Sequence, residues 1–478
     1  MARYDYNMVV IGAGSAGLVT SLVAAGAKAK VALVERHKMG GDCLNTGCVP
    51  SKALIRTASF LRDAKRCEKL GIKKAEVEFD FAAVMERVQR VISAIEPHDS
   101  VERYTGLGVE CIAGQAVIKS PHEVEVAGRV LRTRTIVIAA GARPFVPPLK
   151  GLEKTDYKTS DTIWEIRQQP RRLVVIGGGP IGCELAQAFA YLGSEVTQIQ
   201  GGPRIMPRED QDATDLVTAH FRQAGVNLLT NAQAKEVVVE DGEKYLIAEQ
   251  DGKDERLPFD LLLLAVGRQP NGDAVPGLAE CGVGVSARGV VEVNARLQTA
   301  VPNIYACGDI IGSYQFTHTA GHAAVYAALN ALLPIKRKVN WSVVPWCTFT
   351  HPEVARVGLN EQDAAAQGIP VEVTKYGIDD LDRAIADEEG EGFVKLLTPP
   401  GSKKILGVTI VGDHAGDLIH EYILAMQKGL KVTDVMGMIH IYPTLAESSR
   451  FVASEWFKAH QSPLIGRLSE WINRRARG

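Results

Sequence analysis

The apolar positions of this chain predict the same strand–turn–helix–strand unit twice. In the first copy, an apolar run at 7–11 leads to closely spaced glycines and a helix-like segment, and a second apolar run follows at 31–34. In the second copy, the corresponding runs lie at 172–176 and 195–199. The glycine spacing GxGxxG is the same in both: Gly12, Gly14 and Gly17, then Gly177, Gly179 and Gly182. This is the full context of the dinucleotide fingerprint, so we expect two nucleotide sites.

Each glycine of the fingerprint has a separate task. The first permits a tight turn, the second lets the backbone approach a pyrophosphate, and the third lets the helix pack on the sheet. The unpaired N–H groups at the helix N-terminus then bind the phosphates. The alternative is a pair of glycine turns that bind no nucleotide.

The two copies differ at the position that contacts the ribose. Glu35 lies 23 residues after Gly12 (35 − 12), and the same offset from Gly177 gives Gln200 (200 − 177). A carboxylate there binds a ribose hydroxyl, whereas an amide also tolerates a 2′-phosphate. We therefore expect FAD in the first copy and a nicotinamide nucleotide in the second, with NAD and NADP both left open.

Composition narrows the class of protein. A chain of 478 residues has room for three or four domains. A net charge of −2 gives no reason to expect a nucleic-acid partner. Eight cysteines are too sparse for a secreted disulfide scaffold. The N-terminus has neither a basic leader nor a cleavage site, and glycines and lysines interrupt the apolar stretch 8–34, so a cytoplasmic location is expected.

One pair of cysteines is closely spaced, and it predicts redox chemistry. Cys43 and Cys48 are five residues apart, and Gly41 and Gly47 give the backbone the freedom that a small disulfide needs. A helix is expected over 51–61, so its dipole and the neighbouring Lys52 favour a thiolate at Cys48. The alternatives are a metal site or inert buried thiols. Only His37 is close enough to join a zinc site, so no metal ligands are expected.

The segment GGDCLNTGCVPSK at 40–52, between the two fingerprints, closely resembles the class I pyridine nucleotide–disulfide oxidoreductases. That family includes dihydrolipoamide dehydrogenase, glutathione reductase and mercuric reductase. The resemblance covers nearly the whole chain, with further motifs at 135–144, 263–271, 304–309 and 349–353. It implies an α/β fold with two doubly wound Rossmann-type domains and a C-terminal α+β dimerisation domain. The expected boundaries are 1–150 and 272–345 for FAD, 151–271 for NAD(P) and 346–478 for the homodimer interface.

The resemblance also implies residue roles. Cys48 would face the flavin, Cys43 would meet the external substrate, and Lys52 would lie near the flavin, paired with Glu184. The helix that begins near His318 would direct its positive end at the flavin. Glu184 could instead be a solvated acid on a helix face, and His318 could merely cap its helix. The remaining cofactor-binding positions that the resemblance implies are Gly41, Gly114, Gly141, Gly267, Arg268, Gly308 and Asp309.

The C-terminal motif departs from the family pattern. Lipoamide and glutathione reductases carry His-Pro-Thr-x-x-Glu there, with the histidine as acid/base. This chain has Tyr442 in place of the histidine, retains Glu447, and has His440 two residues earlier. Tyrosine, with a pKa near 10, is a poor base at neutral pH. Either His440 reaches the dithiol, or Tyr442 serves a substrate that needs little proton transfer, or the external reaction is slow.

The expected activity is electron transfer between NAD(P)H and a dithiol, disulfide or thiophilic acceptor, similar to dihydrolipoamide dehydrogenase or mercuric reductase. The usual mercuric reductase also has a C-terminal cysteine pair and often an N-terminal metal-binding domain; neither is expected for this sequence, so a dedicated mercuric reductase is not expected. One alternative is a transhydrogenase or NADH oxidase that does not use the dithiol, and another is a flavin-loaded redox-sensing or binding protein. The tail at 464–477 predicts a basic amphipathic helix, expected to pack on its own subunit, with a membrane surface or a partner as alternatives.

Overall fold

The computed structural model describes residues 4–477, which form two compact units. Unit 1 comprises 4–65, 76–203 and 225–340, and unit 2 comprises 66–75, 204–224 and 341–477. Within 4–477, no helix is both long enough and apolar enough to cross a membrane.

The first sheet of unit 1 contains the first glycine fingerprint. Its strand order is β3-β2-β1-β6-β5-β4, and β17 also pairs with β6. The parallel strands are β1 (Tyr6–Ile11), β2 (Val31–Glu35), β3 (Val109–Ala113), β6 (Arg129–Ile138) and β17 (Ile304–Ala306). The antiparallel extension consists of β5 (Glu123–Val126) and β4 (Val117–Ser120). Five of the six β1 side chains are buried, as in strands covered on both faces.

The second sheet of unit 1 contains the second fingerprint and is parallel throughout. Its strands, in spatial order, are β11 (Asn227–Thr230), β10 (Glu195–Gln200), β9 (Arg172–Ile176), β15 (Leu261–Leu264) and β8 (Lys158–Thr159). An antiparallel sheet follows β11 and contains β12 (Ala232–Glu240), β13 (Glu243–Gln250) and β14 (Lys253–Pro258). A short pair, β7 (Ala142–Pro144) and β16 (Arg268–Pro270), completes the strands of this unit.

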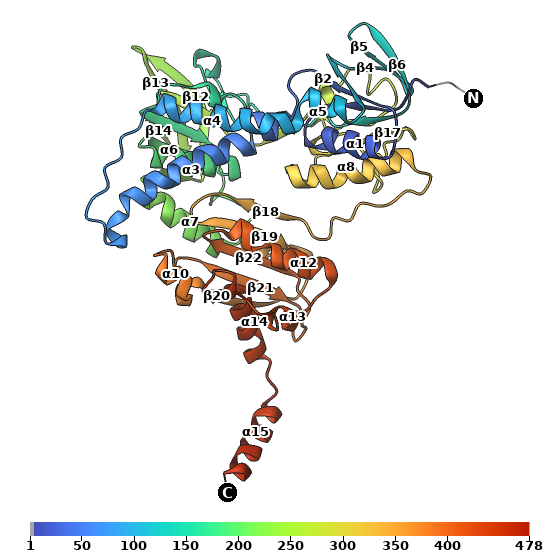
Figure 1. Ribbon diagram of the computed structural model, residues 1–478. Coiled ribbons are helices and arrows are strands. Elements are labelled where there is room, and N and C mark those ends of the chain that lie inside the picture. The colour runs from blue at the N-terminus through green and yellow to red at the C-terminus, as the bar shows by residue number, and fades with distance from the viewer. Residues whose placement is uncertain (1–3, 478) are drawn as a thin grey trace. The chain divides into compact units, whose positions relative to one another are not determined.

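Helices of unit 1 pack on these sheets and on one another. Helices α1 (Ser15–Gly26) and α8 (Thr317–Leu332) lie side by side (Figure 1). Helix α3 (Cys48–Lys65) contacts both α4 (Phe81–Ile95) and α6 (Pro180–Tyr191). The helix expected over 51–61 thus begins earlier, at Cys48 itself. Pro50 lies in the first turn, where a missing N–H costs nothing, so it does not delay the helix.

Unit 2 is built on one antiparallel sheet. Its spatial order is β18 (Pro345–Thr348), β19 (Glu353–Gly358), β22 (Gly407–Gly412), β21 (Phe393–Thr398) and β20 (Glu372–Gly377). Its helices are α7 (Gln211–Gln223), α9 (Glu361–Gln367), α10 (Asp382–Ala386), α11 (Ala415–Leu418), α12 (His420–Lys428), α13 (Val432–Met436), α14 (Glu447–Ala459) and α15 (Pro463–Ala476). Its core includes Tyr422 and Trp456, both almost fully buried.

The predicted fold class is confirmed, with two Rossmann-type regions and a C-terminal α+β domain. Both pairs of strands that were expected around the fingerprints form, within one residue of the expected bounds. Helix α7 follows β10 in the sequence, yet it groups with unit 2. The boundaries at 150, 271 and 345 stay predictions.

Candidate active site

The first fingerprint forms a tight turn that brings the dithiol segment next to it. Gly12 has a φ of +102°, and a Cβ there would lie 2.4 Å from the Ala139 carbonyl oxygen. Gly41 has a φ of +58°, and its Cβ would lie 2.5 Å from the Gly14 Cα. A side chain at either position would therefore collide with backbone. This contact between Gly14 and Gly41 places the segment with both cysteines beside the start of α1.

The second fingerprint repeats the geometry of the first. A Cβ at Gly177 would lie 2.3 Å from the Ala265 carbonyl oxygen, and one at Gly182 would lie 2.1 Å from the Gly177 oxygen. The ribose-binding candidates also correspond. Glu35 accepts a hydrogen bond from Ala13 N at 2.6 Å, and Gln200 accepts one from Gly178 N at 3.0 Å. The two copies thus have the same backbone geometry at the glycine turn. They differ at the ribose-binding position, which is the carboxylate Glu35 in the first copy and the neutral amide Gln200 in the second.

Both fingerprints have the features that a bound dinucleotide needs. Gly14 and Gly179 are the N-cap residues of α1 and α6, and neither has a side chain to cap the helix. The N–H groups of the first helical turn, other than at Pro180, which has none, are therefore available to phosphate oxygens. At Gly179, a Cβ would meet no atom within 4 Å, so the space beside this turn is open. The residues fit two nucleotide cofactors.

Asp309 is a candidate for binding a neutral hydroxyl group. It directly follows Gly308 at the end of β17. Burial raises the pKa of Asp309 to about 6, which Arg268 opposes and the nearby Asp42 and Cys48 increase. A desolvated carboxylate of this kind is stabilised by a hydroxyl donor, as the ribitol of a flavin would supply.

Cys43 and Cys48 come together as two thiols with unequal acidity. Cys43 lies in α2 (Gly41–Asn45), and Cys48 is the first residue of α3. A hydrogen bond from Cys43 lowers the pKa of Cys48 to about 6; burial opposes this, and Thr317 and Lys52 support it. The same hydrogen bond, together with burial, raises the pKa of Cys43. The first proton of the pair therefore leaves Cys48, which is a thiolate at neutral pH.

This thiolate gives a direct test of the geometry. A Cys43→Ala variant loses the donor, so the pKa of Cys48 should rise above its value of about 6. A Cys43→Ser variant is the matched control, because its hydroxyl can still donate. The rate of alkylation by iodoacetamide as a function of pH measures both. Equal midpoints for the alanine and serine variants would show that this hydrogen bond does not set the acidity.

Lys52 and Glu184 link the dithiol helix to the second nucleotide unit. Lys52 Nζ, on α3, lies 2.7 Å from Glu184 Oε2, on α6. The Glu184 side chain is 7% exposed. The alternative of a solvated acid on a helix face is therefore wrong for Glu184. The lysine ammonium lies within one helical turn of Cys48 and favours its thiolate.

Three polar side chains near the dithiol were not predicted from the sequence. Thr317 Oγ1, at the start of α8, lies 3.5 Å from Cys48 Sγ. Asp42 forms a short hydrogen bond and ion pair with Arg268, which also donates to the Ala142 carbonyl oxygen at 2.7 Å. Asp161 lies 3.7 Å from the same guanidinium. The neighbour of Thr317, His318, was predicted, and its ring stacks on Phe316.

The C-terminal candidates lie in unit 2, and each has a different partner. The Tyr442 hydroxyl donates to Asp382 Oδ2 at 2.6 Å, and this bond raises the pKa of Tyr442. His440 Nε2 lies 3.2 Å from Glu421 Oε1, and the His440 side chain is 5% exposed. Glu447 accepts a hydrogen bond from Thr444 N at 3.3 Å. The Tyr442 side chain is exposed, and its hydroxyl is protonated. His440, in contrast, is buried and lies against the carboxylate of Glu421.

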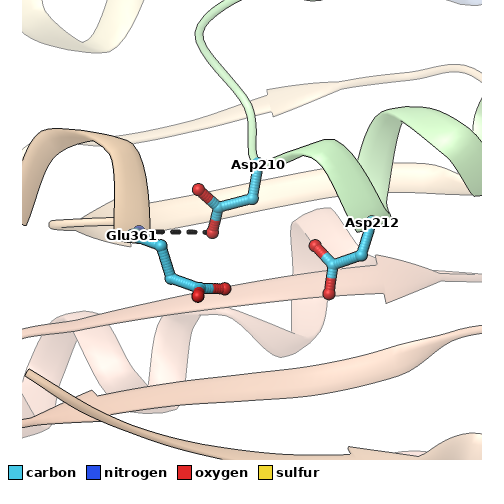
Figure 2. A group of neighbouring side chains, drawn as sticks. All are labelled: Asp210, Asp212 and Glu361. Atoms are coloured by element: carbon cyan, nitrogen blue, oxygen red, sulfur yellow. Dashed lines mark hydrogen bonds between the residues drawn. The ribbon is translucent and has the colours of Figure 1, made fainter. Parts of the chain in front are cut away.

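One group of acids in 4–477 has the spacing of a metal site. Figure 2 shows Asp210, Asp212 and Glu361 with their carboxylates turned toward one another. The Lys395 ammonium lies 2.6 Å from Asp212, 2.6 Å from Glu361 and 3.2 Å from Asp210. An ammonium group therefore already supplies the positive charge that these carboxylates need.

Comparison with known proteins agrees with this geometry. Residues 6–324 match the model of the pyridine nucleotide-disulphide oxidoreductases, and residues 344–452 match the dimerisation domain of the same family. A mercuric reductase of Bacillus cereus is 35% identical over 93% of this chain and 70% of its own length. A dihydrolipoyl dehydrogenase of Chlamydia pneumoniae is also 35% identical, over 93% of this chain and 95% of its own.

A solved structure is similar over the same extent. The HOCl-induced flavoprotein disulfide reductase RclA of Escherichia coli has a TM-score of 0.84 and 28% identity, and covers 94% of this chain and 99% of its own. Proteins of this kind use FAD and NAD(P)H to exchange electrons with a disulfide. This chain belongs to the pyridine nucleotide-disulphide oxidoreductase family and is an FAD- and NAD(P)-dependent flavoprotein oxidoreductase.

Proposed function

We propose that this enzyme passes electrons from NAD(P)H through Cys43 and Cys48 to a thiophilic metal ion. The observation that carries the proposal is Tyr442, which stands where lipoamide and glutathione reductases have their histidine base. Its hydroxyl is committed to Asp382, and its pKa is raised, so it holds its proton at neutral pH. A dithiol substrate must give up protons to a base, whereas a soft metal ion needs only thiolates.

Two groups of relatives support a metal ion as the acceptor. Mercuric reductases are among the most similar curated proteins. RclA of Escherichia coli has been solved as a Cu(II) complex, and that structure has a TM-score of 0.83 with 27% identity. Dihydrolipoyl dehydrogenases are equally similar in sequence, so a dithiol remains the second candidate substrate. The choice between the two therefore depends on the residue at 442.

The cofactor positions of the proposal are the fingerprint residues and those around the dithiol. Bound FAD supplies two-electron transfer between a nicotinamide and a disulfide. The residues proposed to hold FAD and the nicotinamide nucleotide are Gly12, Gly14, Gly17, Glu35, Gly41, Gly114, Gly141, Gly308, Asp309, His318, Gly177, Gly179, Gly182, Gln200, Gly267 and Arg268. The proposed catalytic residues are Cys43, Cys48, Lys52, Glu184 and Tyr442, with Glu447 and His440 as the remaining candidates.

The thiols and their neighbours have separate tasks in the reaction. Cys48 enters as the thiolate, and Cys43 loses its proton when its sulfur binds the incoming metal ion. Lys52 holds positive charge beside Cys48, and Glu184 fixes the lysine in place. The electrons balance: one NAD(P)H reduces one Hg²⁺ to the metal, or two Cu²⁺ to Cu⁺, and gives NAD(P)⁺ and one proton.

The proposal extends to assembly and location. A homodimer is supported by the matched dimerisation domain and by the apolar loop at 438–442, where Ile439 is 98% exposed. A cytoplasmic location is supported by cysteines that are too sparse for a structural disulfide framework. The proposed division is FAD-binding at 1–150 and 272–345, NAD(P)-binding at 151–271 and dimerisation at 346–478.

A comparison of acceptors tests the proposal. Under anaerobic stopped flow, Hg²⁺ with excess thiol, or Cu²⁺ without added thiol, should be reduced faster than glutathione disulfide, and dihydrolipoamide should be oxidised slowly. Both nucleotides should be included, because Gln200 does not exclude NADPH. If dihydrolipoamide turns over faster than any metal ion is reduced, the proposed acceptor is wrong, although the family assignment stands.

Restoring the base should shift the preference. A Tyr442→His variant should increase dihydrolipoamide turnover at least about tenfold, because general-base catalysis is typically worth 10²–10⁴-fold when well placed. A Tyr442→Phe variant is the control, since it removes the hydroxyl without supplying a base. Metal-ion reduction should change less than dithiol turnover in both. An unchanged dithiol rate in Tyr442→His would show that position 442 does not decide the substrate.

A further inference from the structure

The last helix of the chain, α15 (Pro463–Ala476), has an apolar side that is open to solvent. Its apolar side chains recur three and four residues apart, as on one face of a helix. The exposed fractions are 71% for Leu464, 57% for Leu468, 52% for Trp471 and 50% for Ile472. The expectation that this stripe packs on its own subunit is therefore not met. Ile465 belongs to the same stripe in the sequence, but its side chain lies outside the described part.

Helix α15 lies beyond the residues that match the model of the dimerisation domain. The matched domain ends at 452, within α14. The end of α14 is held by His460, whose ring stacks on Trp456 at 4.1 Å and lies 2.9 Å from Glu372. Two residues later, Ser462 Oγ accepts a hydrogen bond from Leu464 N and starts α15. The N-terminus of α15 is thus capped by Ser462, the residue directly before the helix.

The charge of α15 is opposite to that of the rest of the chain. Its segment, 463–478, has four arginines and one glutamate, for a formal charge of +3 (4 − 1). The whole chain has −2, so the remaining residues have −5 (−2 − 3). The Arg475 guanidinium lies 4.4 Å from the centre of the Trp471 ring, and Arg474 pairs with Glu470. Positive charge therefore lies directly beside the apolar stripe.

We propose that α15 lies flat in the surface of a membrane that contains anionic lipids. An apolar stripe buries in the headgroup region while flanking arginines remain with the lipid phosphates. With 14 residues, α15 is too short to span a bilayer, which takes about 20. Two copies of α15 packed together would bring their like charges close, whereas an anionic lipid surface neutralises them. An anionic lipid surface thus accounts for both the positive charge and the exposed apolar stripe of α15.

Sedimentation of the FAD-loaded, full-length enzyme with lipid vesicles tests this. Vesicles of phosphatidylcholine with phosphatidylglycerol should carry the enzyme down, and vesicles of phosphatidylcholine alone should not. An Arg474→Gln/Arg475→Gln variant should bind the anionic vesicles roughly 30-fold more weakly, since each charge near the surface is worth about a factor of five. A Leu468→Ser/Trp471→Ser variant should bind about 100-fold more weakly.

Two controls separate this binding from general electrostatics and from unfolding. An Arg171→Gln/Arg296→Gln variant removes two exposed arginines outside α15 and should bind as wild type. All variants should retain FAD and wild-type reduction of the acceptor, because α15 is outside the proposed active site. The proposal is overturned if wild-type enzyme does not sediment with anionic vesicles, or if the α15 variants sediment equally well. It is also overturned if the variants change dimer mass by light scattering without changing vesicle binding, which would assign the stripe to a second copy.

Discussion

A Cys43→Ser variant is expected to lose at least about 1,000-fold in reduction of every thiophilic acceptor, as removal of an attacking group does in other enzymes. Cys43 is the sulfur proposed to bind the acceptor. Serine binds soft metal ions poorly and cannot form a disulfide. Because its hydroxyl can still donate to Cys48, the thiolate at Cys48 should persist. Steady-state rates with NAD(P)H and each acceptor measure the loss.

A second cysteine serves as the matched control for this variant. Cys111 is partly buried in β3, and burial raises the pKa of its thiol, so Cys111→Ser should keep the wild-type rates. Equal turnover of wild type and Cys43→Ser would place the dithiol outside the electron path. That result would favour the transhydrogenase or NADH oxidase alternative instead.

A Lys395→Met variant is expected to lose about 3 kcal/mol of unfolding free energy, the usual cost of leaving a buried charge without its partner, here the carboxylate of Asp210. Lys395 is 2% exposed and contacts Asp210, Asp212 and Glu361. Lys375 is the matched control: it also contacts Asp212 but is 44% exposed, so Lys375→Met should cost less than about 1 kcal/mol. Urea unfolding of the FAD-loaded enzyme measures both.

The loss in Lys395→Met should depend on pH. Burial raises the pKa of Asp212. The combined effect of Lys375 and Lys395, which lower this pKa, is larger, so the net shift is downward. A carboxyl with a lowered pKa stabilises the fold above its unfolded pKa of about 3.9, and this contribution is lost as pH falls through the folded value. The deficit of the variant should therefore be largest near neutral pH and shrink below about pH 4. A deficit that is constant with pH would point to packing instead of charge.

The nucleotide-binding turns could be predicted because their determinants are local. Gly12 and Gly177 need positive φ, and the spacing of the glycines and apolar runs is visible in the sequence. The strands on either side of these turns could be predicted for the same reason. The start of α3 was displaced by three residues, because the helix was expected only after Cys48, whereas Cys48 and Pro50 already adopt helical geometry.

The parts that were missed depend on contacts between distant residues. Thr317 is 269 residues from Cys48, and the pairing of Tyr442 with Asp382 spans 60 residues. The only sequence signal for Thr317 was its neighbour, His318, at the start of the same helix. Likewise, no local pattern near α7 indicates that this helix groups with unit 2 through acids such as Asp210 and Asp212. Tertiary packing determines such contacts, and a local sequence pattern does not predict them.

Counting thiols at the active site tests the central claim, that electrons from the nicotinamide reach the pair Cys43 and Cys48. Oxidised enzyme would be treated anaerobically with one equivalent of NAD(P)H, unfolded with an alkylating agent, and digested for mass spectrometry. The account predicts that cysteines 43 and 48 both become alkylated only after reduction, with the other six cysteines unchanged. Complete oxidation of the nucleotide with no new thiol at 43 or 48 would contradict it.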